Sequence, residues 1–313
     1  MLSLVIPVYR NAENLPRLFT ELEQLASRVP AGLEVVFVVD GSPDASIDIL
    51  RSRLPGWPVR SQLLELSRNV GSFAAIAAGL TAGRGEYFAV MAADMQEPPD
   101  LILRFLQVLQ SGKADVTFGH RVGRADPFWS RIFSDGFWRL YRRFVVKEMP
   151  AGGVDVFGCT RQVRDHLVGL KEVGTNLIAL LLWLGFRREF VAYERRPRLE
   201  GRSAWTFGRK LRYAVDSVFS FTDLPIRLLL FLGAAGTLAA VAASGVVYTY
   251  WLLGRVSVLG YTPLMLMITF FGGLTALGLG IVGQYLWISI QNTRGRPVFV
   301  VKSSETFGPT SRV

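Results

Sequence analysis

A short polar stretch in the first third of the chain offers the residue types that hold a divalent metal ion. Asp94, Gln96 and Glu97 follow an apolar run at residues 87–93 and precede a pair of prolines. A carboxylate with an amide oxygen two residues later suits Mg²⁺ or Mn²⁺ that is coordinated partly by the phosphates of a substrate. The same residues could instead begin a helix, because proline and acidic residues are favoured in a first helical turn. The stretch alone leaves both interpretations open.

A second chemically suggestive feature is a cluster of arginines between residues 187 and 202. A run of charge is usually a solvated face, and that interpretation stands for this cluster too. The cluster ends, however, beside a loop at residues 201–205 that contains Gly201 and Ser203 and could approach a phosphate.

The polar residues must be positioned by a sheet. Strands are predicted for the apolar runs at residues 2–9, 33–39, 61–66, 87–93 and 114–119, and helical patterns separate them. This alternation predicts an α/β fold with a doubly wound, mostly parallel sheet, in which ligands bind at the carboxyl ends of the strands. The predicted strand ends carry polar residues that would share one edge of the sheet: Asp40, Asp44, Ser67, Arg68, Asn69, Asp94 and Gln96.

Two segments combine aromatic residues with arginine and lysine at helical spacing. They cover residues 126–146 and 205–225. Such a composition is typical of an amphipathic helix in a membrane interface, and a core helix with a solvated basic face is the alternative.

Two long uncharged stretches near the end of the chain predict a pair of transmembrane helices within residues 226–293. Residues 228–254 and 256–293 contain no charged side chain, and each exceeds the ~20 residues that a spanning helix needs. Lysines and arginines flank the pair, while the connecting loop offers only Arg255. The positive-inside rule therefore predicts a multi-pass protein of the cell membrane, with both termini and the catalytic domain, residues 1–204, in the cytoplasm. Residues 294–313 would form a cytoplasmic tail.

Composition narrows the functional classes. The net charge of +10 fits either nucleic acid or an anionic membrane and phosphorylated substrates. Because the basic residues cluster near the predicted spans, a lipid bilayer is the expected partner and nucleic acid is not. The single cysteine, Cys159, excludes an internal disulfide, and two histidines argue against a histidine-based zinc site.

Several motifs together resemble glycosyltransferase family 2, in particular its polyprenyl-phosphate glycosyltransferases, which include dolichol-phosphate mannose synthase and bactoprenol glucosyltransferases. The resemblance covers nearly the whole chain. The matching segments are Val5-Ile-Pro-Val-Tyr9, Asp40-Gly-Ser-Pro-Asp44, Leu66-Ser-Arg-Asn-Val-Gly71, Asp94-Met-Gln-Glu-Pro-Pro99, and Gly201 with Ser203 and Trp205.

The resemblance implies a GT-A (Rossmann-like) fold, a nucleotide-sugar donor, a polyprenyl-phosphate acceptor and inversion at the anomeric carbon. It implies that Asp94 and Gln96 bind Mg²⁺ or Mn²⁺, with Asp94 as a catalytic residue. Arg121, Arg202 and Ser203 would lie near phosphates, and Arg202 would grip the acceptor, with Arg196 and Arg198 as weaker candidates. The implied donor-binding residues are Pro7, Tyr9, Asp40, Ser67, Asn69, Ser203 and, near the sugar, Asp155.

The chain departs from the family pattern at three positions. Ala92 replaces the first aspartate of the metal motif, Val39 replaces an aspartate before Asp40, and Ala204 replaces a common lysine. With one carboxylate fewer, the donor diphosphate would supply more of the metal coordination, and strict metal dependence does not follow. A membrane scaffold with an impaired transferase domain is therefore one alternative function. A processive polysaccharide synthase is another, although the chain lacks the Q-x-x-R-W motif of that class. The oligomeric state is left open, with a homo-oligomer as one option.

Overall fold

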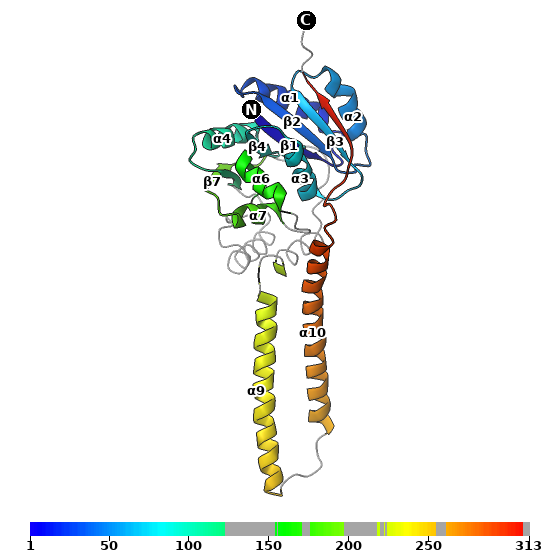
Figure 1. Ribbon diagram of the computed structural model, residues 1–313, viewed down its shortest axis with the longest axis vertical. Helices are drawn as coiled ribbons and strands as arrows, with labels where there is room; N and C mark the ends of the chain where they lie inside the picture. The colour runs from blue at the N-terminus through cyan, green and yellow to red at the C-terminus, as the bar shows by residue number, and fades with distance from the viewer. Residues whose placement is uncertain are drawn as a thin grey trace. The chain divides into compact units, whose positions relative to one another are not determined.

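The computed structural model describes residues 1–122, 154, 156–170, 176–196, 218–219, 222, 224–254 and 261–308 (Figure 1). The chain divides into two compact units, one formed by Met1–Phe207 with Arg296–Val313 and the other by Gly208–Gly295. The described elements, in chain order, are β1 (Leu2–Val8), α1 (Leu15–Ser27), β2 (Leu33–Val39), α2 (Ser46–Arg53), the 3₁₀ turn η1 (Leu54–Gly56), β3 (Arg60–Leu66), α3 (Ser72–Ala82), β4 (Tyr87–Val90), α4 (Pro99–Gln110), β5 (Val116–Arg121), β6 (Phe157–Thr160), α6 (Arg161–Gly169), α7 (Leu177–Trp183), β7 (Arg188–Tyr193), α9 (Leu224–Leu252), α10 (Tyr261–Thr293) and β8 (Val301–Phe307).

The first unit is built on an eight-stranded sheet with the order β7-β5-β6-β4-β1-β2-β3-β8. Strand β1 is parallel to β2 and β4, β2 is parallel to β3, and β5 is parallel to β7. Strand β6 runs antiparallel to both β4 and β5, and β8 runs antiparallel to β3. Six strands therefore share one direction, and their carboxyl ends lie along one edge of the sheet. This mostly parallel arrangement confirms the expected GT-A-like α/β fold.

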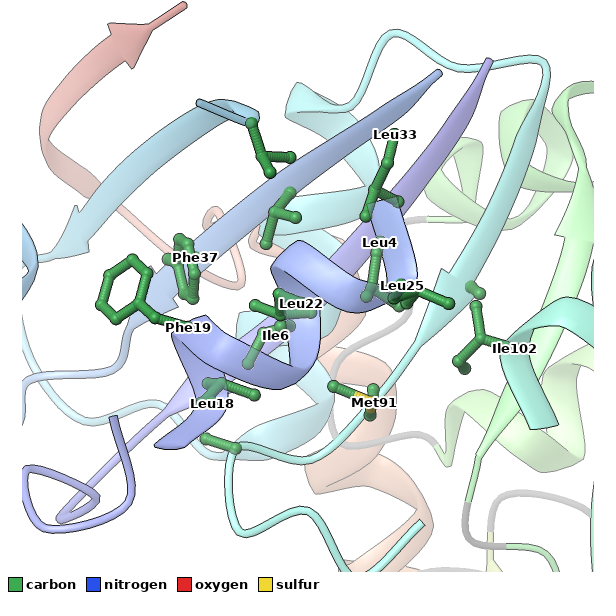
Figure 2. Packing of buried hydrophobic residues seen from close by; sticks show 14 of the residues in the cluster. Leu4, Ile6, Leu18, Phe19, Leu22, Leu25, Leu33, Phe37, Met91 and Ile102 are labelled. Atoms are coloured by element: carbon green, nitrogen blue, oxygen red, sulfur yellow. The ribbon is translucent and has the colours of Figure 1, made fainter. Parts of the chain in front are cut away.

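Helices cover both faces of the central strands, which explains why those strands are continuous apolar runs. On one face, Leu4 and Ile6 of β1 pack with Leu18 and Leu22 of α1 (Figure 2). On the other face, α3 approaches so closely that a Cβ added at Gly79 would lie 2.3 Å from a methyl carbon of Val5. A small residue is therefore required where α3 crosses β1.

The pattern of apolar residues in the first helix predicted its buried face. Five residues of α1 are buried, and all five are the apolar positions that define the helical period: Leu15, Leu18, Phe19, Leu22 and Leu25. Phe19 also meets Trp57 edge-to-face, with ring centroids 5.0 Å apart, and this contact fixes the turn η1 against α1.

The end of the chain folds differently from the expected tail. Residues Val301–Phe307 form β8, which pairs with β3 and forms one edge of the sheet. The guanidinium of Arg51 donates to Glu65 and Glu305, both at 2.9 Å, and the Lys302 ammonium donates to Glu65 at 2.5 Å. Local sequence patterns do not predict this strand, because its side chains are mostly exposed and β3, with which it pairs, lies more than 200 residues earlier.

Two of the predicted strands have boundaries that differ from the prediction by two or more residues. Strand β4 stops at Val90, and the expected strand residues 91–93 lead into a turn in which Met95 has φ 53° and its N–H donates to the Ala92 carbonyl at 3.2 Å. Strand β5 continues to Arg121 because β7 pairs with it as far as Tyr193.

The second unit contains the helices α9, of 29 residues, and α10, of 33 residues. They contact each other: a Cβ added at Gly278 would lie 3.2 Å from the side chain of Leu229. By length and composition, one segment among the described residues, Phe270–Thr293, could cross a membrane, with mean hydropathy 1.4. The apolar helical segment Leu224–Gly236 is shorter, so the second predicted span is not confirmed by this criterion.

Residues 126–146 and most of residues 205–225 lie outside the described part of the chain. The two interfacial helices that we expect there stay predictions.

Candidate active site

The candidate site lies at the edge of the sheet where the six co-directional strands end. Tyr9 follows β1, Asp40 follows β2, the segment 67–71 follows β3, and Asp94 follows β4. Beyond the antiparallel β6, strands β5 and β7 end at the same edge, in Arg121 and before Glu194. The structure thus gathers residues from six strand ends, five of them at strands that the sequence pattern predicted and the sixth at β7, which it did not. We refer to this edge as the rim.

Asp40 organises one part of the rim. Asp40 is buried, with 3% of its surface exposed. Its two carboxylate oxygens accept hydrogen bonds from the backbone N–H groups of Val70 at 2.7 Å and Gly71 at 2.9 Å. Burial raises the pKa of Asp40, and the two N–H groups oppose that rise by favouring the charged form. Asp40 therefore shapes the loop after β3, and a direct contact with a nucleoside stays a prediction.

The loop after β3 is pressed against the turn after β2. The Asn69 side chain donates to the Asp40 carbonyl at 3.1 Å, and Gly41 has φ +56°. A Cβ added at Gly41 would lie 2.4 Å from the backbone nitrogen of Asn69, which leaves no space for any other residue. Ser67 and Asn69 are exposed, so this packing presents them at the surface of the rim.

Asp44 joins the same turn to the loop after β1. It accepts hydrogen bonds from the Ala12 N–H at 3.0 Å and from the Ser42 hydroxyl at 2.6 Å, and Ser42 in turn accepts the Arg10 N–H at 2.7 Å. Burial would raise the pKa of Asp44, but these bonds and those from Ser46 outweigh it and lower the pKa. Pro7 and Tyr9, the predicted nucleotide-pocket residues, are half-buried at the end of β1 beside this network.

The predicted metal motif is held in a tight conformation. The Asp94 carboxylate accepts the Gln96 N–H at 3.4 Å, and Glu97, which is 2% exposed, accepts the Ala92 N–H at 3.3 Å. The Gln96 side-chain oxygen accepts a hydrogen bond from the Arg195 guanidinium at 2.5 Å. Gln96 thus already binds a cationic group of the protein itself.

Arginines that follow β7 complete this part of the rim. The Arg196 N–H donates to the Gln96 backbone carbonyl at 2.9 Å, and the Gln96 amide donates back to the Arg196 carbonyl at 3.4 Å. The Arg196 guanidinium lies 3.6 Å from the Glu21 carboxylate of α1. Arg196, a weaker candidate for the acceptor, is therefore directed to α1 by this ion pair.

The family resemblance implies a divalent metal ion, and the donor set fits it poorly. Ala92 contributes no side-chain ligand, and the Gln96 oxygen is bonded to Arg195. No group of three or more His, Cys, Asp or Glu side chains is arranged to hold a metal ion within the described residues. As arranged, the motif offers Asp94 but not the set of oxygens that a divalent ion requires.

Of the other predicted site residues, the structure describes Arg121 but not the rest. Arg121 ends β5 on the rim and is half-buried, next to His120, whose buried Nδ1 has no hydrogen-bond partner in the described structure. Arg202, Ser203, Arg198 and Asp155 lie outside the described residues, so their roles stay predictions.

Sequence reasoning missed Arg195. It treated the arginines of residues 187–202 as one cluster, whereas the structure divides them by strand position. Arg187 precedes β7 and pairs with Asp115 at 2.8 Å, and Arg195 follows the same strand and meets Gln96. The alternating segment Glu189-Phe-Val-Ala-Tyr193 was the signal that could have placed Arg195 at a strand end.

Comparisons with known proteins identify the family of this chain. The profile of "Glycosyl transferase family 2" matches residues 3–168. The chain is 30% identical over 305 residues to the "uncharacterized glycosyltransferase sll0501" of Synechocystis sp., covering 96% of this chain and 94% of that protein. It is 27% identical to the "bactoprenol glucosyl transferase" of Shigella phage SfX, covering 96% of this chain and 99% of the relative.

Among solved structures, a mannosyltransferase from Pyrobaculum calidifontis in complex with GDP-Man and Mn²⁺ is 16% identical, covers 91% of this chain and 87% of that one, and has a TM-score of 0.46. The family profile and the relatives matched along almost their whole length show that this chain belongs to glycosyltransferase family 2.

Proposed function

We propose that this glycosyltransferase transfers a hexose from a nucleotide sugar to a polyprenyl phosphate at the surface of a membrane. The observation that carries the proposal is the rim, which brings Asp94, the Asp40-bound loop and Arg195 together at the carboxyl edge of one sheet. Relatives named bactoprenol glucosyl transferase, matched along almost their full length, support a polyprenyl-phosphate acceptor.

The donor half of the rim suits a nucleoside diphosphate. Pro7 and Tyr9 would line the nucleotide pocket, and the segment 67–71, held by Asp40, offers exposed Ser67 and Asn69 as polar contacts. Asp94 and the basic residues Arg121 and Arg195 lie further along the edge, where the diphosphate and sugar would follow. The guanidinium groups of Arg121 and Arg195, held at fixed positions, would stabilise the negative charge that develops on the leaving diphosphate.

The acceptor phosphate needs little activation by the protein. A phosphate oxygen of the lipid is already an anion, so it can attack the anomeric carbon without a strong general base. A new bond forms between that oxygen and the carbon, the bond from the carbon to the diphosphate breaks, and the nucleoside diphosphate leaves with the electron pair. Attack from the face opposite the leaving group inverts the anomeric configuration. The protein would then contribute mainly orientation and charge stabilisation.

Chain connectivity supports a membrane hairpin. Strands β7 and β8 belong to the same sheet, although α9 and α10 lie between them in the chain. If α10 crosses a bilayer, the chain must cross an even number of times for β8 to rejoin that sheet. Helix α9 is 29 residues long, with an uncharged run from 228 to 254, and is the element available for the second crossing. We therefore propose two spans, with the sheet domain on the cytoplasmic side.

The direct test is an assay of the full-length protein with undecaprenyl phosphate and dolichyl phosphate against a panel of UDP- and GDP-sugars, with products identified by mass spectrometry. One of these nucleotide sugars should yield a hexosyl polyprenyl phosphate. Asp94→Asn should lower turnover by at least about tenfold while the protein still folds, because a strand-end carboxylate serves the ligand. Absence of glycolipid with every donor and either acceptor would contradict the proposal.

A further inference from the structure

The contact between Arg195 and Gln96 places a positive charge where the family pattern leads us to expect a metal ion. The Arg195 guanidinium donates to the Gln96 side-chain oxygen at 2.5 Å. Two further hydrogen bonds, at 2.9 Å and 3.4 Å, hold the Gln96 backbone and amide against Arg196. These two bonds hold Gln96 in place, so the oxygen that the Arg195 guanidinium contacts has a fixed position.

Arg195 has hydrogen-bonding capacity beyond this contact. A guanidinium carries five N–H donors in a planar fork, and one nitrogen of Arg195 is used on Gln96. Its Nε is buried and has no hydrogen-bond partner within the described part of the chain. A planar fork of this kind matches the oxygens of a phosphate.

The charge of the substrates makes a cation necessary here. A nucleoside diphosphate carries negative charge past Asp94, and the acceptor phosphate adds more, so the anions repel one another unless a cation lies between them. In this chain Ala92 supplies no carboxylate for a metal ion, and the Gln96 oxygen is already bonded. The motif therefore offers few ligands for a metal ion at the place where it holds an arginine.

We infer that Arg195, held on Gln96, is the cation that binds the donor diphosphate next to Asp94, so that donor binding does not require a divalent metal ion. This inference rests on the proposed function, because it assumes a nucleoside diphosphate at the rim. It follows that Arg195 and a divalent ion compete for the Gln96 oxygen, since two cations at one oxygen repel each other.

The test measures binding of UDP and GDP to the full-length protein by calorimetry, once with EDTA and once with Mn²⁺. The wild type should bind one of the two nucleotides with similar affinity in both conditions. Arg195→Ala should weaken that binding at least about tenfold in EDTA, as expected for loss of a charge-assisted hydrogen bond, and Mn²⁺ should restore part of it. Arg195→Lys should be intermediate, because it keeps the charge but not the fork.

Two further variants sharpen the test. Gln96→Ala removes the oxygen that positions Arg195 and should also weaken binding in EDTA. Arg187→Ala is the matched control, because it removes an arginine at the opposite end of β7 whose partner is Asp115. Its nucleotide affinity should equal that of the wild type. If Arg195→Ala does not fold, as judged by its circular dichroism, Arg195→Lys and Gln96→Ala decide the question.

The outcomes separate this inference from the proposed function. Nucleotide binding that appears only with Mn²⁺, together with unchanged affinities in the Arg195 variants, overturns the inference and leaves the function intact. Binding of neither nucleotide in either condition overturns both. Mn²⁺ affinity, measured by electron paramagnetic resonance without nucleotide, gives an independent readout: it should rise in Arg195→Ala, and a fall would contradict the proposed competition.

Discussion

Single residues on the rim act mainly by arranging other residues. Asp40 illustrates this, because both of its carboxylate oxygens accept backbone N–H groups from the loop after β3. A carboxylate is suited to the task, since it can accept two bonds at once and lies buried between two strand ends. Asp40 thereby fixes the positions of the exposed side chains of Ser67 and Asn69, and it can do so without touching a ligand itself.

This role predicts the effect of Asp40→Asn. The amide keeps one acceptor oxygen, so one N–H of the pair formed by Val70 and Gly71 loses its partner. We expect a loss of about 1–3 kcal/mol in the free energy of unfolding and weaker nucleotide binding. Denaturant titration and calorimetry would measure the two effects.

Asp48→Asn is the matched control, because Asp48 is exposed in the first turn of α2, close to Asp40 in the chain. It should leave nucleotide affinity unchanged. Wild-type affinity in Asp40→Asn as well would show that the loop does not depend on this carboxylate.

Elements position the rim through close backbone contacts between consecutive turns. The turn after β2 packs on the loop after β3 at Gly41, where backbone atoms leave no room for a side chain. The terminal strand β8 supports the same loop from the sheet edge: the Ser67 N–H donates to the Val300 carbonyl at 2.9 Å. The loop after β3 is thus held from two sides, by the turn at Gly41 and by the segment that leads into β8.

Gly41→Ala should disturb the first of these supports. The added methyl would lie 2.4 Å from the Asn69 nitrogen, and φ +56° is unfavourable for alanine. Because the obstructing atoms belong to the backbone, we expect a loss of about 2–4 kcal/mol in stability and weaker nucleotide binding. Gly56→Ala is the control, since a Cβ there meets nothing within 4 Å. Equal effects of the two substitutions in thermal unfolding would contradict this account.

The second support should depend on pH through Glu65. A hydrogen bond from Lys302 lowers the pKa of Glu65; burial opposes it, and Ser303 and Arg51 lower it further. A carboxyl group with a lowered folded-state pKa stabilises the fold above its ordinary pKa of 4.5, and this stabilisation is lost as the pH falls through the folded-state value. Strand β8 should therefore loosen below about pH 4.5.

Hydrogen exchange of the amides of residues 301–307, corrected for intrinsic rates, would measure this loosening. Glu65→Gln should reduce protection already at neutral pH and flatten its pH dependence. Glu13→Gln, at an exposed position, should behave like the wild type. A pH-independent strand in the wild type would refute the role of Glu65.

At the scale of the whole molecule, the return of the chain to the sheet constrains its topology. Residues before α9 and after α10 contribute strands to one sheet, so both flanks of the helical pair must lie on the same side of any membrane that the pair crosses. The charge pattern, with arginines and lysines flanking the pair and only Arg255 between the helices, leads independently to the same topology.

Cysteine labelling tests this topology with little background. Cys159 is fully buried, and burial raises the pKa of its thiol to about 12, so the native cysteine should not react. In intact cells, a membrane-impermeant maleimide should label Ser257→Cys, which lies between α9 and α10 in the chain, and should label Ser311→Cys only after the membrane is opened. Labelling of both positions from outside would exclude the hairpin.

Much of the fold followed from the sequence, because its signals are local. The buried face of α1 and the apolar strands around Phe37 and Phe88 appear as periodicity or as continuous apolar runs, and the strand–helix alternation implies a parallel sheet with its ligand site at the strand ends. The candidates Asp40, Asn69, Asp94 and Arg121 lie along that edge, because strands that share a direction end on the same side of the sheet.

The tertiary structure decided what no local pattern encodes. Strand β8 is a half-exposed edge strand, defined by its pairing with β3 and not by its own composition. The sequence likewise could not assign separate roles to neighbouring arginines. Arg187 lies before β7 and pairs with Asp115, whereas Arg195 and Arg196 follow β7 and contact Gln96 and Glu21. Contacts between residues 99 positions apart, such as Arg195 with Gln96, depend on strand order, and strand order is settled only when the whole sheet packs.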